Sequence, residues 1–438
     1  LLIFIAVANT FIDGGFGSAL IQKKEPTQED YSTIFYWNLF LSIVLYGILF
    51  FTAPFIADFY EISLLTPVLR VQGGVLILNA LSIIQCNQLR KQLRFRLIAS
   101  VNLTASLLSV VITIVLAWIG WGIWALVAQQ LLFSLFNAIL FWSFNKWVPS
   151  FLFSKKSFKE LFGFGGFILL SSLINTFCDN IHGVLIGKFF SPAIMGLYTQ
   201  ARKLEEIAST SISSVVNQVA YPVLSEFQND NLSMIRVLQR FITSLAFLVF
   251  PLMMLLILIA KPLIILLYSD KWVASVPYFQ ILCIAGMAIC LQMINYNAVA
   301  AIGRSDILLK WTIIKRSLGL ILNIGGLICF GMYGLLWGGV LTAYSLYFIN
   351  SYLASRYVGY RIKSQIKDLF PIIITVLLTF VITYFLSNLV VLNIYFEGLS
   401  VTIIFMILYL SLSSVFNLSS FNQFRMLGVE VIKKFRTA

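Results

Sequence analysis

The chain has 438 residues, of which 60% are hydrophobic and only 11% are charged, and its formal net charge is +13. This composition excludes a water-soluble globule, because a folded soluble domain has about 25% charged residues. Together with a positive mean hydropathy, it indicates that the solvent of this protein is a bilayer.

Long apolar runs separated by charged clusters follow one another along the whole sequence. A helix needs roughly 20 apolar residues to cross the hydrocarbon core. Backbone groups in lipid must bond within their own segment, so these runs predict helices rather than the short alternating strands of a barrel. In chain order, thirteen crossings are predicted at 1–21, 31–57, 62–89, 97–119, 122–144, 161–188, 192–225, 236–260, 272–302, 306–330, 333–355, 369–390 and 396–418.

Two uncharged stretches, 97–145 and 317–355, are too long for one crossing and are predicted to fold back as hairpins. Glycine-containing turn signals lie at the required places, at 120–122 and at 331–334. The chain opens with Leu1 inside an apolar segment, so we expect that its natural N-terminal helix is missing.

The five cysteines all lie in predicted helices, without a CxxC pair or a neighbouring histidine. They are Cys86, Cys178, Cys283, Cys290 and Cys329. We therefore expect no disulfide framework, no metal site and no cofactor.

The cations separate by side of the membrane. Of the 30 Lys and Arg residues, 22 fall in alternate loops and in the tail, at 23–24, 90–96, 146–159, 236–240, 304–310, 356–367 and 425–436. The opposite loops hold only Lys188, Lys261 and Lys271. The positive-inside rule then predicts that the first set and the C-terminus are cytoplasmic. The net charge thus reflects topology, and we expect no nucleic-acid partner.

An internal repeat is visible in two short matches. FTAPFIADFYE at 51–61 aligns with IAKPLIILLYS at 259–269, an offset of 208, and GWGIWALV at 120–127 aligns with MYGLLWGG at 332–339, an offset of 212. Transporter folds are commonly built by such duplication. With one missing helix restored, the repeat predicts two six-helix lobes and an additional C-terminal helix pair. We expect an N-terminal lobe at 1–146, a C-terminal lobe at 147–356, and the extra pair with the tail at 357–438.

Four stretches carry a resemblance to a known family. They read GGFGSALIQKKEPTQEDYSTIFYWNL at 14–39, NQLRKQLRFRLIA at 87–99, IGKFFSPAIMGLYTQARKLEE at 186–206 and VVNQVAYPVLSEFQND at 215–230. In combination the sequence resembles the polysaccharide transporter family of the multidrug, oligosaccharidyl-lipid and polysaccharide exporter superfamily. The chain departs from the family pattern in lacking the first helix and in carrying His182, where many relatives have Asp.

The resemblance implies a MATE-like exporter fold of fourteen helices. It also implies a transporter rather than an enzyme: a flippase of undecaprenyl-pyrophosphate-linked oligosaccharides in the bacterial inner membrane, serving lipopolysaccharide, capsule or exopolysaccharide synthesis by alternating access. The implied partners are this lipid-linked substrate, membrane lipids, other polysaccharide-assembly proteins, and H⁺ or Na⁺ as the coupling ion. Two alternatives stay open, a cation-coupled exporter of drugs or organic cations with the same fold and a membrane polymerase or ligase of polysaccharide assembly.

Five cations fall inside predicted helices, namely Arg70, Arg202, Lys203, Lys315 and Arg316. A charge near mid-bilayer costs on the order of 3 kcal/mol or more, so it normally faces a cavity or a partner. Since the Arg fork suits phosphate oxygens, we interpret the five as a cationic cavity for the pyrophosphate of the carrier lipid. The expected polar lining is Gln72, Asn79, Thr199, Glu206, Ser213, Asn217, Thr312 and Asn323.

Other interpretations of the same cations stay open. Arg202 and Glu206 are four residues apart and can pair with each other without a ligand. Lys315 and Arg316 lie near the cytoplasmic end of their helix and can snorkel to headgroups, and Arg70 lies near the opposite surface.

Three further residues are candidates for ion coupling. Asp13 precedes Gly14 and Gly15 and is expected to break the first helix. Asp179 and His182 are three residues apart, and an imidazole titrates near neutral pH, which would allow proton coupling. A buried pair without a transport role, or placement at the surface near Lys188, is the alternative for these two.

Overall fold

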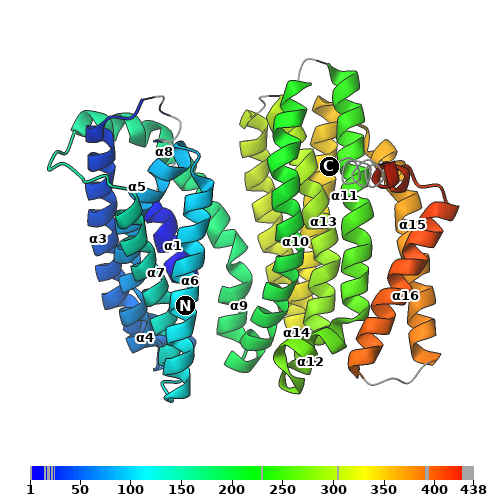
Figure 1. Ribbon diagram of the computed structural model, residues 1–438, viewed down its shortest axis with the longest axis horizontal. Helices are drawn as coiled ribbons and strands as arrows, with labels where there is room; N and C mark the ends of the chain where they lie inside the picture. Colours follow the sequence, from blue (N-terminus) through cyan, green and yellow to red (C-terminus); the bar gives the residue numbers. More distant parts are fainter. Residues whose placement is uncertain are drawn as a thin grey trace, which may run out of the picture. The chain divides into compact units, whose positions relative to one another are not determined.

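The computed structural model describes residues 2–13, 16, 20, 23, 25–227, 230–302, 305–389 and 394–426. These residues form helices and connecting segments and contain no β-strand, which confirms the all-helical prediction. The chain divides into two compact units, Leu1–Phe189 and Phe190–Ala438, in each of which the long helices run roughly along one direction (Figure 1). The division falls 43 residues beyond the expected lobe boundary after residue 146, because the helices of 155–189 pack with the first unit. The assignment of lobes by the repeat stays a prediction.

The first unit is organised around α3 and α5. Its helices are α1 (Leu2–Asp13), α3 (Gln28–Tyr60), α4 (Leu65–Gln72), α5 (Gly74–Lys91), α6 (Phe95–Trp118), α7 (Ile123–Phe144), α8 (Lys155–Asp179) and α9 (Ile181–Phe189). Buried side chains of α1, α3, α4 and α5, among them Ile12, Leu49, Leu69 and Leu76, form one core cluster. The apolar residues that predicted these crossings thus pack on one another where the helices meet.

The second unit is organised around α13, which packs against α10, α11 and α14. Its elements are α10 (Pro192–Glu226), α11 (Asn231–Leu258), α12 (Ala260–Tyr268), a 3₁₀ turn (Asp270–Ser275), α13 (Val276–Ala301), α14 (Ser305–Tyr357), α15 (Ile362–Leu389) and α16 (Ile394–Val415). Small side chains along α13, such as Gly286 and Ala298, allow its neighbours to approach closely.

Within the described residues, nine helices are long and apolar enough to cross a membrane. They are Gln28–Tyr60, Leu65–Lys91, Phe95–Trp118, Ile123–Phe144, Asn231–Leu258, Asp270–Ala301, Lys310–Tyr357, Ile362–Ser387 and Phe396–Val415. The Lys310–Tyr357 helix contains two of the predicted crossings. The chain is therefore a multi-pass membrane protein, as its composition predicts.

Two predicted crossings are each built from a pair of helices. The crossing at 62–89 is divided between α4 and α5 at Gly73, where an added Cβ would lie 2.8 Å from a ring carbon of Tyr46. The crossing at 161–188 is divided at Asn180, whose side chain donates to the Thr176 carbonyl and satisfies one helix-end acceptor. Both divisions depend on local contacts that apolar run length does not reveal.

Both predicted hairpins are present. Gly122 begins α7 with φ 53° and ψ −124°, and Gly331 breaks α14 with φ 60° and ψ −136°. Positive φ of this kind is accessible to glycine at little cost. The two glycines are 209 residues apart, close to both offsets of the predicted repeat, 208 and 212. The repeat itself remains a prediction.

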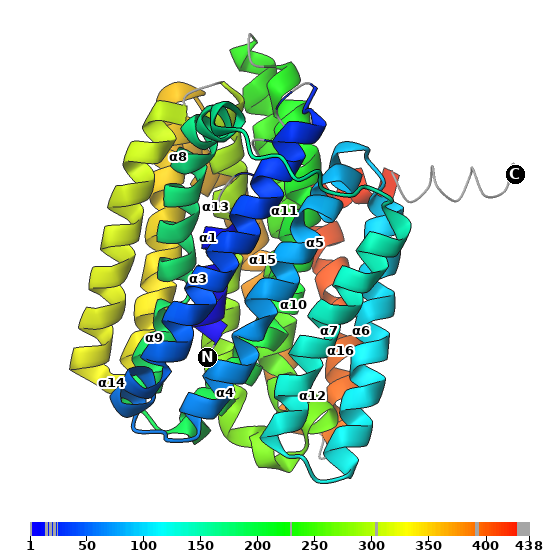
Figure 2. The same cartoon turned by 90° about the vertical axis from the view of Figure 1, so that its left-hand side faces the viewer.

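The two arms of α14 contact each other through backbone (yellow tones in Figure 2). A Cβ added at Gly326 would lie 2.1 Å from the Gly334 carbonyl oxygen, and one at Gly338 would lie 2.6 Å from that of Leu322. Small residues permit such close approach of helices in membranes. This contact closes the hairpin.

The last two helices are attached to the second unit by polar contacts. Gln365 of α15 is fully buried and bonds to Asn295 of α13 at 3.3 and 3.2 Å, to Tyr347 of α14 at 3.4 Å, and to Ser351. Tyr409 of α16 donates to the Phe247 carbonyl at 2.8 Å. The helix pair, orange and red in Figure 1, is thus joined to α11, α13 and α14 by specific hydrogen bonds.

We predict that Gly326→Ala disrupts the α14 hairpin, because the new methyl group meets backbone that cannot move aside without separating the arms. Gly325→Ala is the matched control, since nothing lies within 4 Å of its added Cβ. Replacing glycine by alanine in a helix gains up to about 1 kcal/mol. Melting temperatures in detergent should fall for Gly326→Ala and stay equal or rise for Gly325→Ala. Equal behaviour of the two variants would contradict the contact.

Candidate functional site

Three candidate residues of the first unit have partners within that unit. Arg70 Nε donates to the Phe50 carbonyl at 3.3 Å, and its guanidinium lies 4.4 Å from the centre of the Phe50 ring. Gln72 is buried and bonds to Gln130 of α7. Asn79 donates to Asn9 of α1 at 3.1 Å. These three side chains join α4 to α3 and α7, and α5 to α1.

On α10, the pairing considered for Arg202 and Glu206 is present. Arg202 Nε donates to Glu206 Oε1 at 2.7 Å, with side chains 32% and 44% exposed. A second guanidinium nitrogen lies 3.4 Å from the hydroxyl of the buried Tyr198. Lys203 is exposed, and Thr199 is half-buried with its hydroxyl donating to the Met195 carbonyl.

The serines one and two turns further along α10 face the interior of the unit. Ser213 donates to Cys290 Sγ of α13 at 3.2 Å, and the Cys290 thiol lies 3.7 Å from the Ser209 carbonyl. The polar residues of α10 are therefore divided into two parts. The first part holds the accessible ion pair, and the next part packs on α13.

On α14, Lys315 is buried rather than extended toward the membrane surface. Its Nζ donates to Asn350 Oδ1 at 2.8 Å and lies 5.4 Å from the centre of the Tyr296 ring. Asn350 in turn donates to Gln292 of α13. The neighbouring Arg316 and Thr312 are half-buried. Asn323 is buried and donates to the Gly319 carbonyl.

The two groups of cations in the second unit lie at different levels along α13. Glu205, one helical turn after Arg202, faces Gly286 of α13. Lys315 faces Tyr296 of the same helix. Ten residues of helix separate these contact points, or about 15 Å at 1.5 Å per residue. The α10 and α14 cations therefore form two sites within this unit and not one cluster.

The structure describes the side chains of only some of the ion-coupling candidates. Gly14 and Gly15, and the side chains of Asp13 and Asn217, lie outside what the structure describes. Asp179 is exposed at the end of α8, and His182 is half-buried on α9, on the other side of the junction at Asn180.

Glu205 is a buried carboxylate that the sequence analysis did not single out as a site residue. It is 5% exposed, and its Oε1 has no hydrogen-bond partner among the described residues. A Cβ added at Gly286 would lie 2.5 Å from this oxygen and 3.3 Å from the Met253 methyl group. A carboxylate in so apolar a place is costly when ionised, so this position favours uptake of a proton or cation.

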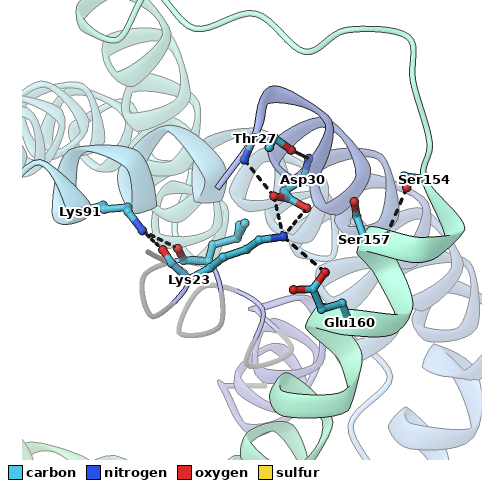
Figure 3. Close-up of polar contacts among 8 residues, drawn as sticks. Lys23, Thr27, Asp30, Lys91, Ser154, Ser157 and Glu160 are labelled. Atoms are coloured by element: carbon cyan, nitrogen blue, oxygen red, sulfur yellow. Dashed lines mark hydrogen bonds and ion pairs between the residues drawn. The ribbon is translucent and has the colours of Figure 1, made fainter. Parts of the chain in front are cut away.

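A polar cluster joins two of the stretches that carry the family resemblance (Figure 3). Lys23 pairs with the buried Asp30 at 3.0 Å and with Glu160 of α8 at 3.5 Å. Asp30 also completes a capping box with Thr27 at the start of α3. Lys91 at the end of α5 donates to the Leu20 carbonyl at 3.1 Å. The hydrogen bond to Asp30 raises the pKa of Lys23 and keeps this lysine charged.

One part of the Lys23–Asp30 cluster, the capping box, could be recognised in the sequence. Thr27-Gln28-Glu29-Asp30 before an apolar run has the spacing of a capping box, with Asp in the place of the usual Glu. Its charged partners on α5 and α8 are distant in the sequence and became evident only in the fold.

The chain is similar in sequence and in fold to known proteins. The family model described as "Polysaccharide biosynthesis protein" matches residues 1–277, well over half of the chain. The chain belongs to this family. The match to the polysaccharide biosynthesis family includes the whole first unit, α10 with its ion pair and Glu205, and the Lys23–Asp30 cluster.

Curated relatives carry similar names. The teichuronic acid biosynthesis protein TuaB of Bacillus subtilis is 29% identical over 306 residues, covering 69% of this chain and 63% of the relative. The lipopolysaccharide biosynthesis protein WzxC of Escherichia coli is 24% identical, covering 72% of this chain and 65% of the relative. The matched part thus spans slightly less than two thirds of either relative.

The fold of this member of the polysaccharide biosynthesis family is also that of solved transporters. It matches the lipid II flippase MurJ in an inward closed conformation with a TM-score of 0.72 and 18% identity, over 94% of this chain and 91% of MurJ. The MATE transporter VcmN of Vibrio cholerae matches with a TM-score of 0.53 and 13% identity, over 83% and 87% of the two chains. The prediction of a MATE-like exporter fold is confirmed.

We predict that Asp30→Ala destabilises the first unit by roughly 2 to 4 kcal/mol. Loss of a helix cap costs about 1 kcal/mol, and a hydrogen bond to a charged group about 1.5 to 3 kcal/mol. Glu29→Ala is the control, because Glu29 is an exposed acid in the same helical turn. Melting temperatures in detergent measure the difference, and an equal effect of the two substitutions would show that the cluster does not stabilise the protein.

We also predict that Gly286→Ala is destabilising because of Glu205. Overpacking of a core typically costs about 1 to 3 kcal/mol. In a Glu205→Ala background the closest atom is removed, so the same Gly286→Ala change should cost much less. A double-mutant cycle on melting temperatures measures this coupling, and additive effects would mean that Glu205 does not occupy the space in front of Gly286.

Proposed function

We propose that this protein is a flippase that moves undecaprenyl-pyrophosphate-linked oligosaccharides across the bacterial inner membrane by alternating access. The observation that best supports this function is the similarity of fold to a lipid II flippase over 94% of the chain. The chain is also a member of a polysaccharide biosynthesis family. Charge asymmetry between alternate loops supports a cytoplasmic C-terminus.

The interior cations supply the chemistry for an anionic headgroup. Arg202 is partly accessible and already engages one carboxylate at 2.7 Å. A pyrophosphate can replace or share this partner, because both groups accept parallel hydrogen bonds from the guanidinium. Lys203 lies next to Arg202 on α10, and Arg316 supplies a further cation at the second site of this unit. The buried Lys315 donates a hydrogen bond to Asn350 and has a structural role next to Arg316.

An exporter of drugs or organic cations is the second candidate, and the MATE transporter VcmN shares the fold. Its TM-score of 0.53 is lower than the 0.72 of the lipid II flippase. Sites for organic cations favour acidic groups, whereas five cations lie inside the predicted crossings of this chain. The balance of charge favours an anionic cargo.

Glu205 is the group we assign to coupling, alongside the earlier candidates Asp179 and His182. It is buried against Gly286, its Oε1 has no partner among the described residues, and it directly precedes Glu206 of the Arg202–Glu206 pair. The titratable and charged groups that interact with Glu205 include Cys283 and Cys290 of α13, and Tyr198, Arg202 and Glu206 of its own helix. Protonation of Glu205 would leave Arg202 the stronger partner for an anion, so proton uptake and headgroup binding would be linked.

The test uses the protein in liposomes with a fluorescent undecaprenyl-pyrophosphate oligosaccharide, and it measures how much substrate becomes accessible to a quencher on the far side. Wild type should move substrate, and Arg202→Gln with Arg316→Gln should lower the rate about tenfold, as expected for loss of charge-assisted hydrogen bonds. The control is Lys363→Gln with Lys367→Gln, which removes two exposed cations at the start of α15.

Each outcome discriminates among the proposals. Movement that is insensitive to Arg202 and Arg316 would remove the anion site from these residues, and export of organic cations without lipid movement would favour the second candidate.

In a second arm, the proton gradient is collapsed. Wild type should slow, and Glu205→Gln should be indifferent to the gradient. A Glu205→Gln variant with unchanged gradient dependence would exclude this coupling group.

A further inference from the structure

A hollow of about 470 Å³ lies between the two arms of α14, close to their ends at Ser305 and Tyr357. It is lined by Ile307, Lys310, Trp311 and Ile314 from the first arm and by Arg356 and Tyr357 from the second. The described residues that line it do not include Thr312, Lys315 or Arg316, the nearest candidate residues on this helix.

Among the side chains that the structure describes, the two cations of the hollow have no acidic partner. Neither Lys310 nor Arg356 has a carboxylate within ion-pair distance among the described residues. Arg356 contacts two aromatic side chains, with 3.5 Å to the Tyr352 hydroxyl and 5.7 Å to the centre of the Tyr357 ring. Lys23, Lys188 and Arg202, by contrast, have carboxylates at 3.0, 3.6 and 2.7 Å. Two like charges at one hollow repel unless an anion lies between them.

The remaining lining is suited to the boundary between headgroups and hydrocarbon. Ile307 and Ile314 are apolar, and Trp311 packs against Tyr352 with ring centres 6.3 Å apart. Tryptophan and tyrosine concentrate at membrane interfaces, where one end of the ring system is apolar and the other is hydrated. The ends of α14 belong to the positively charged loops at 304–310 and 356–367, which are predicted to be cytoplasmic.

We infer that this hollow binds the phosphate of an anionic bilayer lipid, with Lys310 and Arg356 on the phosphate and the acyl chains along the isoleucines. Basic pockets between transmembrane helices on the cytoplasmic side are suited to anionic headgroups. A soluble anion would engage only the cations and leave the apolar half of the lining without a partner. The lipid would neutralise the ends of the α14 hairpin, independently of what the protein transports.

The experiment is native mass spectrometry of the full chain, released from detergent containing either phosphatidylglycerol or phosphatidylcholine. Wild type should retain phosphatidylglycerol preferentially, and Lys310→Gln with Arg356→Gln should weaken this retention about fivefold for each cation removed. Arg361→Gln with Lys363→Gln is the matched control, since it removes two exposed cations of the same loop that do not line the hollow. Melting temperatures verify that both variants fold.

A charge-conserving variant, Lys310→Arg with Arg356→Lys, keeps the proposal testable if the glutamine pair fails to fold. It should retain the lipid. Equal loss of lipid in the control pair would mean diffuse surface attraction and would overturn the site. Displacement of phosphatidylglycerol by millimolar inorganic phosphate would make it a site for a soluble anion, and stronger retention of undecaprenyl phosphate would make it a carrier-lipid site. Either result would overturn the assignment to a bilayer phospholipid.

Discussion

A polar group in hydrocarbon needs a partner inside the protein, and this requirement governs most of the described contacts. Backbone groups find partners within helices, and side chains find them across helices. Arg70 uses a backbone carbonyl of α3, Lys315 an amide of the opposite arm of α14, and Gln365 an array of side chains from two neighbouring helices. The same contacts that satisfy these groups determine which helices are neighbours.

Several buried polar atoms of the described residues lack a hydrogen-bond partner, and Glu205 carries the one carboxylate oxygen among them. Its neighbour Glu206 is partly accessible and paired with Arg202, while Glu205 faces Gly286 and Met253 with an oxygen that has no partner in the described part of the chain. Stability alone would favour an apolar side chain here, since burying an unpaired carboxylate destabilises a fold. Intramembrane groups of this kind commonly belong to the transport mechanism, which is why we assign coupling to this residue.

Much of the fold was predictable because bilayer thickness sets the length of each apolar run. The all-helical class, both hairpins and the positions of most crossings follow from that constraint and from glycine in the turns. The breaks at Gly73 and Asn180 were not predictable, since they depend on Tyr46 and on a local cap. For the candidate site, the pairing of Arg202 with Glu206 could be read from helical spacing. The burial of Glu205 and of Lys315 could not, because Gly286 and Asn350 lie 81 and 35 residues away along the chain.

The closed hairpin of α14 also bears on how the chain is made. The backbone contact between Gly326 and Gly334 joins residues only eight positions apart, and contacts of such low sequence separation form quickly. Both arms can therefore associate during synthesis, before α15 and α16 leave the ribosome. Lys315 then meets Asn350 within the same nascent hairpin, so its charge already has a hydrogen-bond acceptor when the remaining helices arrive. The glycine turn thus protects the insertion of a buried lysine as well as shaping the finished bundle.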